Sequence, residues 1–283
     1  MATLRSYLSF IRFSHSVFAL PFALVGALLA ARHVPVAWTA IGWIVVAMVA
    51  ARSAAMGFNR LADADYDARN PRTAMREIPR GVISRPAAAV FVAVASGAFL
   101  FAASRLSLLC LALAPVALAI VFWYSLAKRY TTYTQAFLGL AMAVAPVGGW
   151  LAAGGRGGWE PWLLGLAIGL WVGGFDVLYA CQDVDFDRAH GLHSVPVRFG
   201  VAGALTISRA MHVLAVAAMA ALGVAAGLGP VYAAGVLVVA ALLAYEQSLV
   251  RADDLSQVKR AFDLNGYVGI LYLAATALAV YIP

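Results

Sequence analysis

Charged residues are scarce in this chain of 283 residues. Asp, Glu, Lys and Arg make up 12% of it, hydrophobic residues make up 64%, and the mean hydropathy is +0.87. So little charge does not cover a water-facing surface, which excludes a soluble globular domain. Cysteine is scarcer still, because Cys110 and Cys181 are the only two and both fall in apolar segments. This pattern indicates neither a disulfide framework nor a zinc site.

The apolar residues form long runs. Spanning a bilayer takes about 20 mostly apolar residues, and nine such windows follow one another along the chain: 14–31, 36–58, 86–103, 106–127, 133–153, 161–181, 201–226, 230–249 and 261–282. The opening segment has no small-residue cleavage site after its first apolar stretch, so we interpret it as a short basic tail. We therefore predict an all-α integral membrane protein with nine transmembrane helices, in which residues 1–283 form one domain.

The net charge of +7 reflects positive residues in separate short loops rather than one basic region, so no nucleic acid partner is predicted. With the N-terminus in the cytoplasm, fifteen basic residues lie on the cytoplasmic side: Arg5, Arg12, Arg60, Arg69, Arg72, Arg76, Arg80, Arg85, Lys128, Arg129, Arg188, Arg198, Arg251, Lys259 and Arg260. Only Arg32, Arg105 and Arg156 lie on the opposite side. This bias predicts a cell-membrane protein whose C-terminus lies on the opposite face.

Acidic residues are concentrated in two short stretches. Seven of the thirteen are there: Asp63, Asp65, Asp67, Glu77, Asp183, Asp185 and Asp187. Asn59, Asp63 and Asp67 are each four residues apart, and Tyr179, Asp183 and Asp187 have the same spacing. If the second and sixth spans continue as helices beyond the membrane, each series forms a polar row on one helical face. Like charges so placed repel unless a cation lies between them. Oxygen ligands of this kind suit Mg²⁺, which completes its shell with substrate phosphates and so implies a diphosphate substrate.

The two rows recur at a fixed offset of 120 residues, as Asn59 and Tyr179 or Asp63 and Asp183 illustrate. One row follows the second span and the other follows the sixth, four spans later, so both lie on the same side of the membrane. We predict a parallel repeat of two four-helix units, about 14–127 and 133–249, with 261–282 as a ninth helix. Two such units packed side by side bring the rows to face each other across one cavity.

Arginines follow the first row at intervals of four, as Arg72, Arg76 and Arg80. Their guanidinium groups match phosphate oxygens, and the prolines and Gly81 of this segment predict a shaped loop. Lys128 and Arg129, just after the fourth span, are further candidates for binding the diphosphate. The alternative for all of these residues is that they serve only membrane topology.

At these residues the sequence resembles the UbiA superfamily of intramembrane aromatic prenyltransferases. The family's first signature, Asn-Asp-x-x-Asp-x-x-x-Asp, corresponds to NRLADADYD at 59–67, and its second, Asp-x-x-x-Asp, corresponds to DVDFD at 183–187. Arg60 departs from the pattern, because many members have aspartate there. The strings FSHSVFALPF at 13–22 and NPRTAMREIPRG at 70–81 resemble the branch of the family that serves quinone biosynthesis.

The resemblance implies a function and a set of ligands. It implies Mg²⁺-dependent transfer of a polyprenyl group from polyprenyl diphosphate to the ring of a 4-hydroxybenzoate-type acceptor, in ubiquinone or menaquinone biosynthesis. The metal ligands are then Asn59, Asp63, Asp67, Asp183 and Asp187, and the four aspartates are catalytic. A dry cavity inside the helix bundle keeps water from the allylic carbocation. The alternative is the same reaction on a dihydroxynaphthoate acceptor, in menaquinone biosynthesis by the futalosine route.

Charged side chains inside the spans are candidates for a functional role, because burying a charge in the bilayer costs free energy. Arg52 precedes Asn59 by seven residues and Asp176 precedes Asp183 by seven, so both lie two turns along the same faces. We expect Arg52, Asp176 and Tyr179 to bind the acceptor. The alternatives are a structural ion pair between Arg52 and Asp176 and an interfacial aromatic at Tyr179.

Other charged residues receive lesser roles. Asp65 and Asp185 lie off the row faces and are expected to pair with nearby arginines, whereas Arg12 and His15 are weak site candidates. Arg209, His212 and Glu246 are expected to link helices.

Two other classes of protein were weighed. A membrane transporter would also show parallel repeats and charges within spans, but its charges belong at mid-bilayer, whereas the acids here lie at the ends of spans. A lipid-headgroup transferase of the CDP-alcohol type is recognised by an Asp-x-x-Asp-Gly-x-x-Ala-Arg string, which this sequence lacks.

Overall fold

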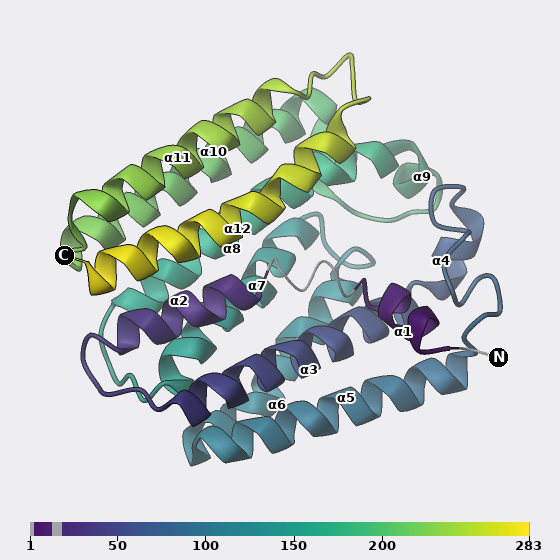
Figure 1. Ribbon diagram of the computed structural model, residues 1–283. Coiled ribbons are helices and arrows are strands. Elements are labelled where there is room, and N and C mark those ends of the chain that lie inside the picture. The colour runs from purple at the N-terminus through teal and green to yellow at the C-terminus, as the bar shows by residue number, and fades with distance from the viewer. Residues whose placement is uncertain (1–2, 13–18, 283) are drawn as a thin grey trace.

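The computed structural model describes residues 3–12 and 19–282 and shows a bundle of long helices (Figure 1). Eight are long and apolar enough to cross a membrane. They are α3 (Trp38–Ala62), α5 (Arg85–Leu106), α6 (Leu108–Ala127), α7 (Thr134–Ala152), α8 (Glu160–Ala180), α10 (Val195–Ala225), α11 (Gly229–Ser248) and α12 (Val258–Tyr281). The prediction of an all-α membrane protein is confirmed.

The predicted count of nine spans is not confirmed within the described residues. The window 14–31 contains only α2 (Leu20–Ala30), a helix of 11 residues, and residues 13–18 lie outside the described part of the chain. Eleven residues make about 16 Å of helix, which is shorter than a bilayer core of about 30 Å. The division into two four-helix units stays a prediction, although α3 packs on α5 as its counterpart α8 packs on α10.

Local sequence sets where the helices begin. The side chains of Ser84, Ser107 and Ser194 cap α5, α6 and α10 by accepting a hydrogen bond from the third following backbone amide. The predicted start of the seventh span at 201 coincides with the start of the long uninterrupted part of α10, and a preceding turn begins at Val195 behind its serine cap. An interruption at Gly200, with φ 71° and ψ 171°, separates this first turn from the rest, and glycine tolerates this backbone without steric cost.

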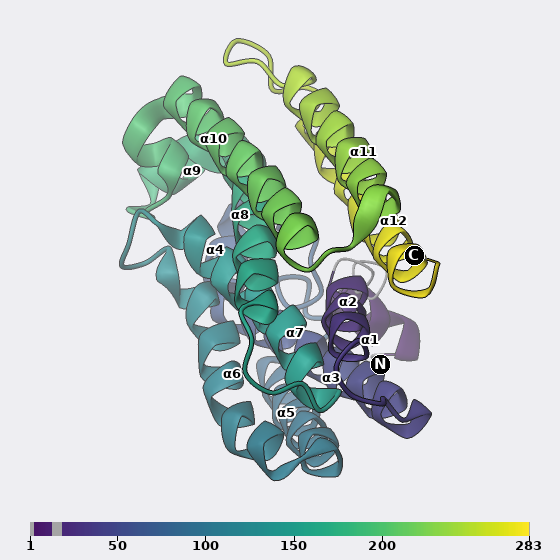
Figure 2. The same ribbon diagram turned by 90° about the vertical axis from the view of Figure 1, so that its left-hand side faces the viewer.

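Both acidic rows lie where a long helix is interrupted. Asp63 ends α3 and precedes the short helix α4 (Ala64–Arg69), whereas α8 ends in a 3₁₀ turn, Cys181–Asp183, followed by α9 (Val184–Ala189). The interruption at Asp63 is slight, because the backbone amides of Asp63 and Asp67 still donate to the carbonyl oxygens of Asn59 and Asp63, at 2.9 and 2.8 Å. Each interruption places the last aspartate of its row on a short helix. Figures 1 and 2 show α4 and α9 at the same end of the bundle.

Close packing of small residues positions the helices that flank the site. A Cβ atom on Gly149 of α7 would lie 2.0 Å from the carbonyl oxygen of Ala23 on α2, so only glycine permits this approach. Beside this contact, Phe22 and Trp171 are buried with their ring centroids 5.0 Å apart. The first half of the chain is thereby joined to α8, which carries the second acidic row.

Candidate active site

A polar cavity of about 310 Å³ lies at the end of the bundle that carries α4 and α9. All the predicted site residues except Arg80 and Arg129 line it, namely Arg52, Asn59, Asp63, Asp67, Arg72, Arg76, Lys128, Asp176, Tyr179, Asp183 and Asp187. Residues about 120 positions apart are thus brought to one cavity, as the repeat predicted.

Asp63 is buried and is paired with a lysine from another helix. Its Oδ2 atom accepts a hydrogen bond from Lys128 Nζ at 2.7 Å and one from Asn59 Nδ2 at 3.4 Å. Its Oδ1 atom is buried and has no hydrogen-bond partner, although Arg129 Nη2 lies 4.0 Å away. Burial raises the pKa of Asp63 and the Lys128 ammonium opposes this effect. One oxygen of this carboxylate therefore lacks the partner that buried polar atoms normally have.

Asp67 lies on α4 and is held by an arginine of the following loop. Arg76 Nη1 donates to both carboxylate oxygens of Asp67, at 2.7 and 2.8 Å. The hydroxyl of Thr73 donates to the backbone oxygen of Asp67 at 3.2 Å. The loop is therefore fixed against the short helix at its backbone and at its charged side chains.

Asp183 binds the same loop from the other half of the chain. Arg72 Nε donates to Asp183 Oδ1 at 2.9 Å, Arg72 Nη2 pairs with Oδ2, and Arg72 Nη1 donates to the Tyr179 hydroxyl at 3.0 Å. Asn70 Nδ2 donates to Asp183 Oδ1 at 3.1 Å, and its own Oδ1 accepts from the backbone amide of Arg72 at 2.9 Å. The loop after the first acidic row is thus fastened to the second row.

Among the charged residues that line the cavity, the predicted site residues Arg52, Asp176 and Asp187 have no ion pair within the described part of the chain. The Nε atom of Arg52 is buried and has no hydrogen-bond partner. The structural ion pair between Arg52 and Asp176, offered as an alternative from the sequence, is not formed in the described part of the chain. These two side chains are therefore available to a ligand.

Two predicted site residues do not line the cavity. Arg80 is exposed and is therefore not placed to bind a diphosphate there. Arg129 donates to the carbonyl oxygen of Ala62 and lies 5.5 Å from the ring of Tyr66. Its Nη2 atom is 4.0 Å from Asp63 Oδ1, so its role at the site stays a prediction.

The lesser predictions have mixed outcomes. Asp65 pairs with Arg85, and Asp185 lies 4.0 Å from Arg188, so their expected pairing with arginines is confirmed. Glu246 is buried, and His212 is buried against the carbonyl oxygen of Trp171.

The remaining basic residues have separate outcomes. Arg209 is exposed, so its expected role between helices is wrong, because its side chain lies on the outer face of α10. Arg12 lines the cavity, whereas His15 lies outside the described residues. Arg60, which departs from the family pattern, is buried and donates from Nε to the carbonyl oxygen of Phe10 at 3.3 Å.

Sequence reasoning missed several residues that line the cavity, and Asn70 and Tyr124 are two of them. Asn70 connects the two acidic rows. Its position in the sequence, between the first row and the arginines, could have indicated that it belongs to the site. Tyr124 lies one turn before Lys128 on α6 and lines the cavity. The four-residue spacing between Tyr124 and Lys128 could have placed both on one helical face. Tyr124 was overlooked because the rest of this span is apolar and contains other large side chains.

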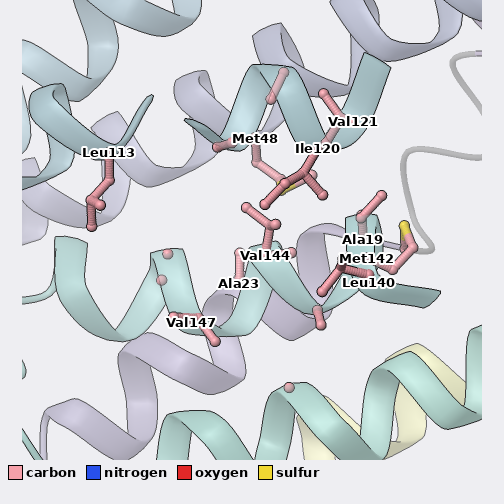
Figure 3. Close-up of a pocket in the computed structure, with 18 of the residues that line it drawn as sticks. Ala19, Ala23, Met48, Leu113, Ile120, Val121, Leu140, Met142, Val144 and Val147 are labelled. Atoms are coloured by element: carbon pink, nitrogen blue, oxygen red, sulfur yellow. The ribbon is translucent and has the colours of Figure 1, made fainter. Parts of the chain in front are cut away.

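A second cavity of about 750 Å³ adjoins the polar one and is lined almost entirely by apolar side chains (Figure 3). Leu113, Val121, Val144 and Val147 are among the residues labelled there. Both cavities share four lining residues: Arg52, Tyr124, Leu138 and Met142. An apolar cavity is therefore present inside the bundle, and it adjoins the acidic site at these four side chains.

The donor atoms of the polar cavity fit a hard divalent cation. The described residues contain no group of three or more His, Cys, Asp or Glu side chains that could hold a metal by themselves. Mg²⁺ does not need one, because it binds through one or two carboxylates, waters and substrate phosphates. The free oxygen of Asp63 and the amide oxygen of Asn59 are ligands of this type.

The fold and the cavities define a class of protein: a helical membrane enzyme with an acidic and arginine-rich site that opens onto an apolar chamber. The model of the UbiA prenyltransferase family matches residues 19–276. The chain therefore belongs to the UbiA prenyltransferase family, and the prediction of a prenyltransferase is confirmed. The transporter alternative receives no support.

Curated relatives match most of the chain. A 4-hydroxybenzoate octaprenyltransferase of Vibrio campbellii is 31% identical over 254 residues, which is 89% of this chain and 88% of the relative. A protein of the same name from Alkalilimnicola ehrlichii is 33% identical over 239 residues, covering 84% and 81% of the two chains.

Solved structures share the fold. The apo structure of a UbiA homolog from Aeropyrum pernix K1 has a TM-score of 0.86 and 37% identity, covering 93% of this chain and 96% of that one. A UbiA homolog from Archaeoglobus fulgidus, bound to GPP and Mg²⁺, has a TM-score of 0.73 at 18% identity and covers 98% of this chain and 100% of that one. The second likeness bears on the fold alone.

Proposed function

We propose that this protein transfers a polyprenyl group from polyprenyl diphosphate to a ring carbon of a 4-hydroxybenzoate-type acceptor, with Mg²⁺ as cofactor. The observation that carries the proposal is that the polar and the apolar cavity adjoin at Arg52, Tyr124, Leu138 and Met142. A substrate with a charged head and a long apolar tail matches this shape. The names of the curated relatives support the acceptor, and the acidic and basic side chains of the polar cavity, with the unpartnered Asp63 Oδ1 atom, support the diphosphate and the metal.

The diphosphate end of the donor binds between the acidic rows. Asn59, Asp63 and Asp67 on one side and Asp183 and Asp187 on the other would hold Mg²⁺, which when bound neutralises negative charge on the leaving diphosphate. Arg72, Arg76 and Lys128 lie in the same cavity, each paired with one of these aspartates. Their donors stabilise the diphosphate as its charge grows.

The acceptor binds where the polar cavity meets the apolar one. The Arg52 guanidinium, with a buried Nε atom that lacks a partner, receives the carboxylate of the aromatic acid. Asp176 and the Tyr179 hydroxyl orient the ring hydroxyl from α8. These contacts place the ring beside the allylic carbon of the donor.

The reaction breaks one bond and forms another. The bond between the allylic carbon and the diphosphate oxygen breaks, and the electron pair leaves with the diphosphate. The ring carbon ortho to the hydroxyl forms the new carbon–carbon bond, and the ring then loses the proton from that carbon. The apolar cavity keeps water from the allylic carbon while this happens.

Placement in the membrane belongs to the same proposal. The end of the bundle with α4 and α9 faces the cytoplasm, the C-terminus lies on the opposite face, and the enzyme is in the cell membrane. The excess of positive loops at the site end supports this orientation.

The test uses membranes that contain the full chain, labelled polyprenyl diphosphate, Mg²⁺ and one of two acceptors. Prenylated 4-hydroxybenzoate is the expected product, and membranes lacking the protein are the control. Prenylation of a dihydroxynaphthoate instead would show that the proposed acceptor is wrong and that the proposed reaction, prenyl transfer to an aromatic ring, is right. If neither ring is prenylated, the proposed function is wrong.

A further inference from the structure

The polar and apolar cavities meet at four side chains, which we call the junction: Arg52 of α3, Tyr124 of α6, and Leu138 and Met142 of α7. Two of them are polar and come from the first four-helix unit. The other two are apolar and come from one helix of the second. The junction thus has one polar side and one apolar side, contributed by different parts of the chain.

Helix α7 changes character at the junction. Thr134 and Gln135 line only the polar cavity, whereas Val144 lines only the apolar one. Between them, Leu138 and Met142 line both cavities, and their four-residue spacing puts them on one face of the helix. Met142 is 9% exposed, and it is labelled at the cavity wall in Figure 3.

We propose that Leu138 and Met142 are specificity-determining residues that contact the first isoprene unit of the donor and keep water from its allylic carbon. The inference rests on the proposed function. A donor with its diphosphate among the acidic rows and its tail in the apolar cavity crosses the junction, so its reactive carbon lies there. Leucine gives this wall a defined shape, and methionine, with its flexible thioether, fills the remaining irregular space.

The side reaction that this wall prevents is hydrolysis of the donor. The allylic carbon–oxygen bond breaks as in prenyl transfer, with the electron pair leaving on the diphosphate. A water molecule then forms the new bond to carbon and loses a proton to solvent, which gives a prenyl alcohol. A smaller side chain at the junction admits water from the polar cavity to this carbon.

The experiment measures prenyl alcohol and prenylated ring from labelled donor in membranes with the full-length Leu138→Ala and Met142→Ala variants. We expect the ratio of alcohol to ring product to rise about tenfold, a typical effect of one pocket contact on discrimination. The inhibition constant of inorganic diphosphate should equal that of the wild type in both variants, because the side chains that contact the diphosphate are unchanged. Met142→Leu, which nearly conserves volume, should restore the wild-type ratio.

Val144→Ala is the matched control, because Val144 lies on the same helix and lines only the apolar cavity. Wild-type ratios in both junction variants, or an equal rise in Val144→Ala, would overturn the inference. If Met142→Ala fails to bind inorganic diphosphate and is therefore misfolded, Leu138→Ala decides the outcome. If the wild type prenylates neither ring, the proposed function fails, and the hydrolysis rates of the variants still decide the role of the junction.

Discussion

Asp63 and Asp183 hold corresponding places in the two acidic rows, and each is paired with a basic side chain. Asp63 is paired with Lys128, and Asp183 with Arg72. The sequence predicted these carboxylates and both cations as site residues. It did not predict which cation pairs with which acid, because those pairs join residues 65 and 111 positions apart that only the helix packing brings together.

Asp63→Ala and Asp183→Ala should each lower prenyl transfer by about 100-fold or more, because each removes a group that would hold the metal and diphosphate. The measurement is product formation in membranes, with the amount of inserted protein determined in parallel. Asp65→Ala is the control, since Asp65 is exposed and pairs with Arg85 outside the cavity. Normal activity in either site variant would contradict the assignment.

Asn70→Asp should reduce activity more than Asn70→Ala. Asn70 donates a hydrogen bond to Asp183, and an aspartate in its place would repel that carboxylate instead. The alanine variant loses this hydrogen bond to a charged group, which corresponds to about tenfold, and it also loses the bond that Asn70 Oδ1 accepts from the backbone amide of Arg72. Kinetics at varied donor concentration provide the measurement, and equal activities of the two variants would exclude a role for this bond.

At the scale of helices, α8 is held by a chain of buried hydrogen bonds from α10 and α11. Gln247 Nε2 donates to Ser208 Oγ at 2.7 Å and lies 3.0 Å from His212 Nδ1. Ser208 Oγ in turn donates to the carbonyl oxygen of Gly174, and His212 Nε2 lies 3.2 Å from that of Trp171. Both carbonyl groups lie within five residues before Asp176, so this chain fixes the part of α8 that enters the site.

Gln247→Leu should lower the thermal stability of the protein in detergent, because it removes both interhelical bonds. The expected loss is about 1 kcal/mol, since hydrogen bonds between membrane helices average somewhat less than this each. Ser248→Ala is the control, because Ser248 is exposed and its hydroxyl bonds only within its own helix, to the carbonyl oxygen of Tyr245. Equal melting temperatures of the two variants would refute the structural role.

Gly149→Ala should destabilise the contact between α2 and α7, whereas Gly148→Ala should not. A Cβ atom at Gly149 would lie 2.0 Å from the carbonyl oxygen of Ala23, but at Gly148 nothing lies within 4 Å. Overpacking of this kind costs about 1–3 kcal/mol. Thermal unfolding of the two variants side by side is the measurement, and a stable Gly149→Ala protein would show that the two helices can separate without cost.

For the whole molecule, hydrophobic runs of about 20 residues predicted the long helices, and the predicted ends of most lie within a few residues of those observed. The exceptions have physical causes. A capping serine and a Pro196 turn start α10 earlier than hydropathy indicates. The interruptions at Asp63 and at 181–183 lie where Lys128 and Arg72 contact Asp63 and Asp183, and a four-residue spacing does not encode such contacts between distant segments.

Removal of divalent metal should abolish prenyl transfer and leave the fold intact, because the described helices pack through apolar side chains and internal ion pairs. Treatment of membranes with EDTA, followed by Mg²⁺, tests this through activity and melting temperature. Full recovery with Mg²⁺ is expected. Unfolding on chelation, or activity without metal, would contradict the prediction.

The helix interruptions also fix the depth of the site. Helix α3 has 25 residues and is about 37 Å long, whereas α8 has 21 and is about 31 Å long. A bilayer core is about 30 Å thick, and irregular backbone is not tolerated in contact with lipid tails. If α3 tilts to absorb its extra length, the lengths of the two helices would bring both interruptions to the layer of lipid headgroups. Under the proposed function, a water-soluble acid and a membrane-dissolved isoprenoid would then meet at this boundary, and neither would have to leave the phase in which it dissolves.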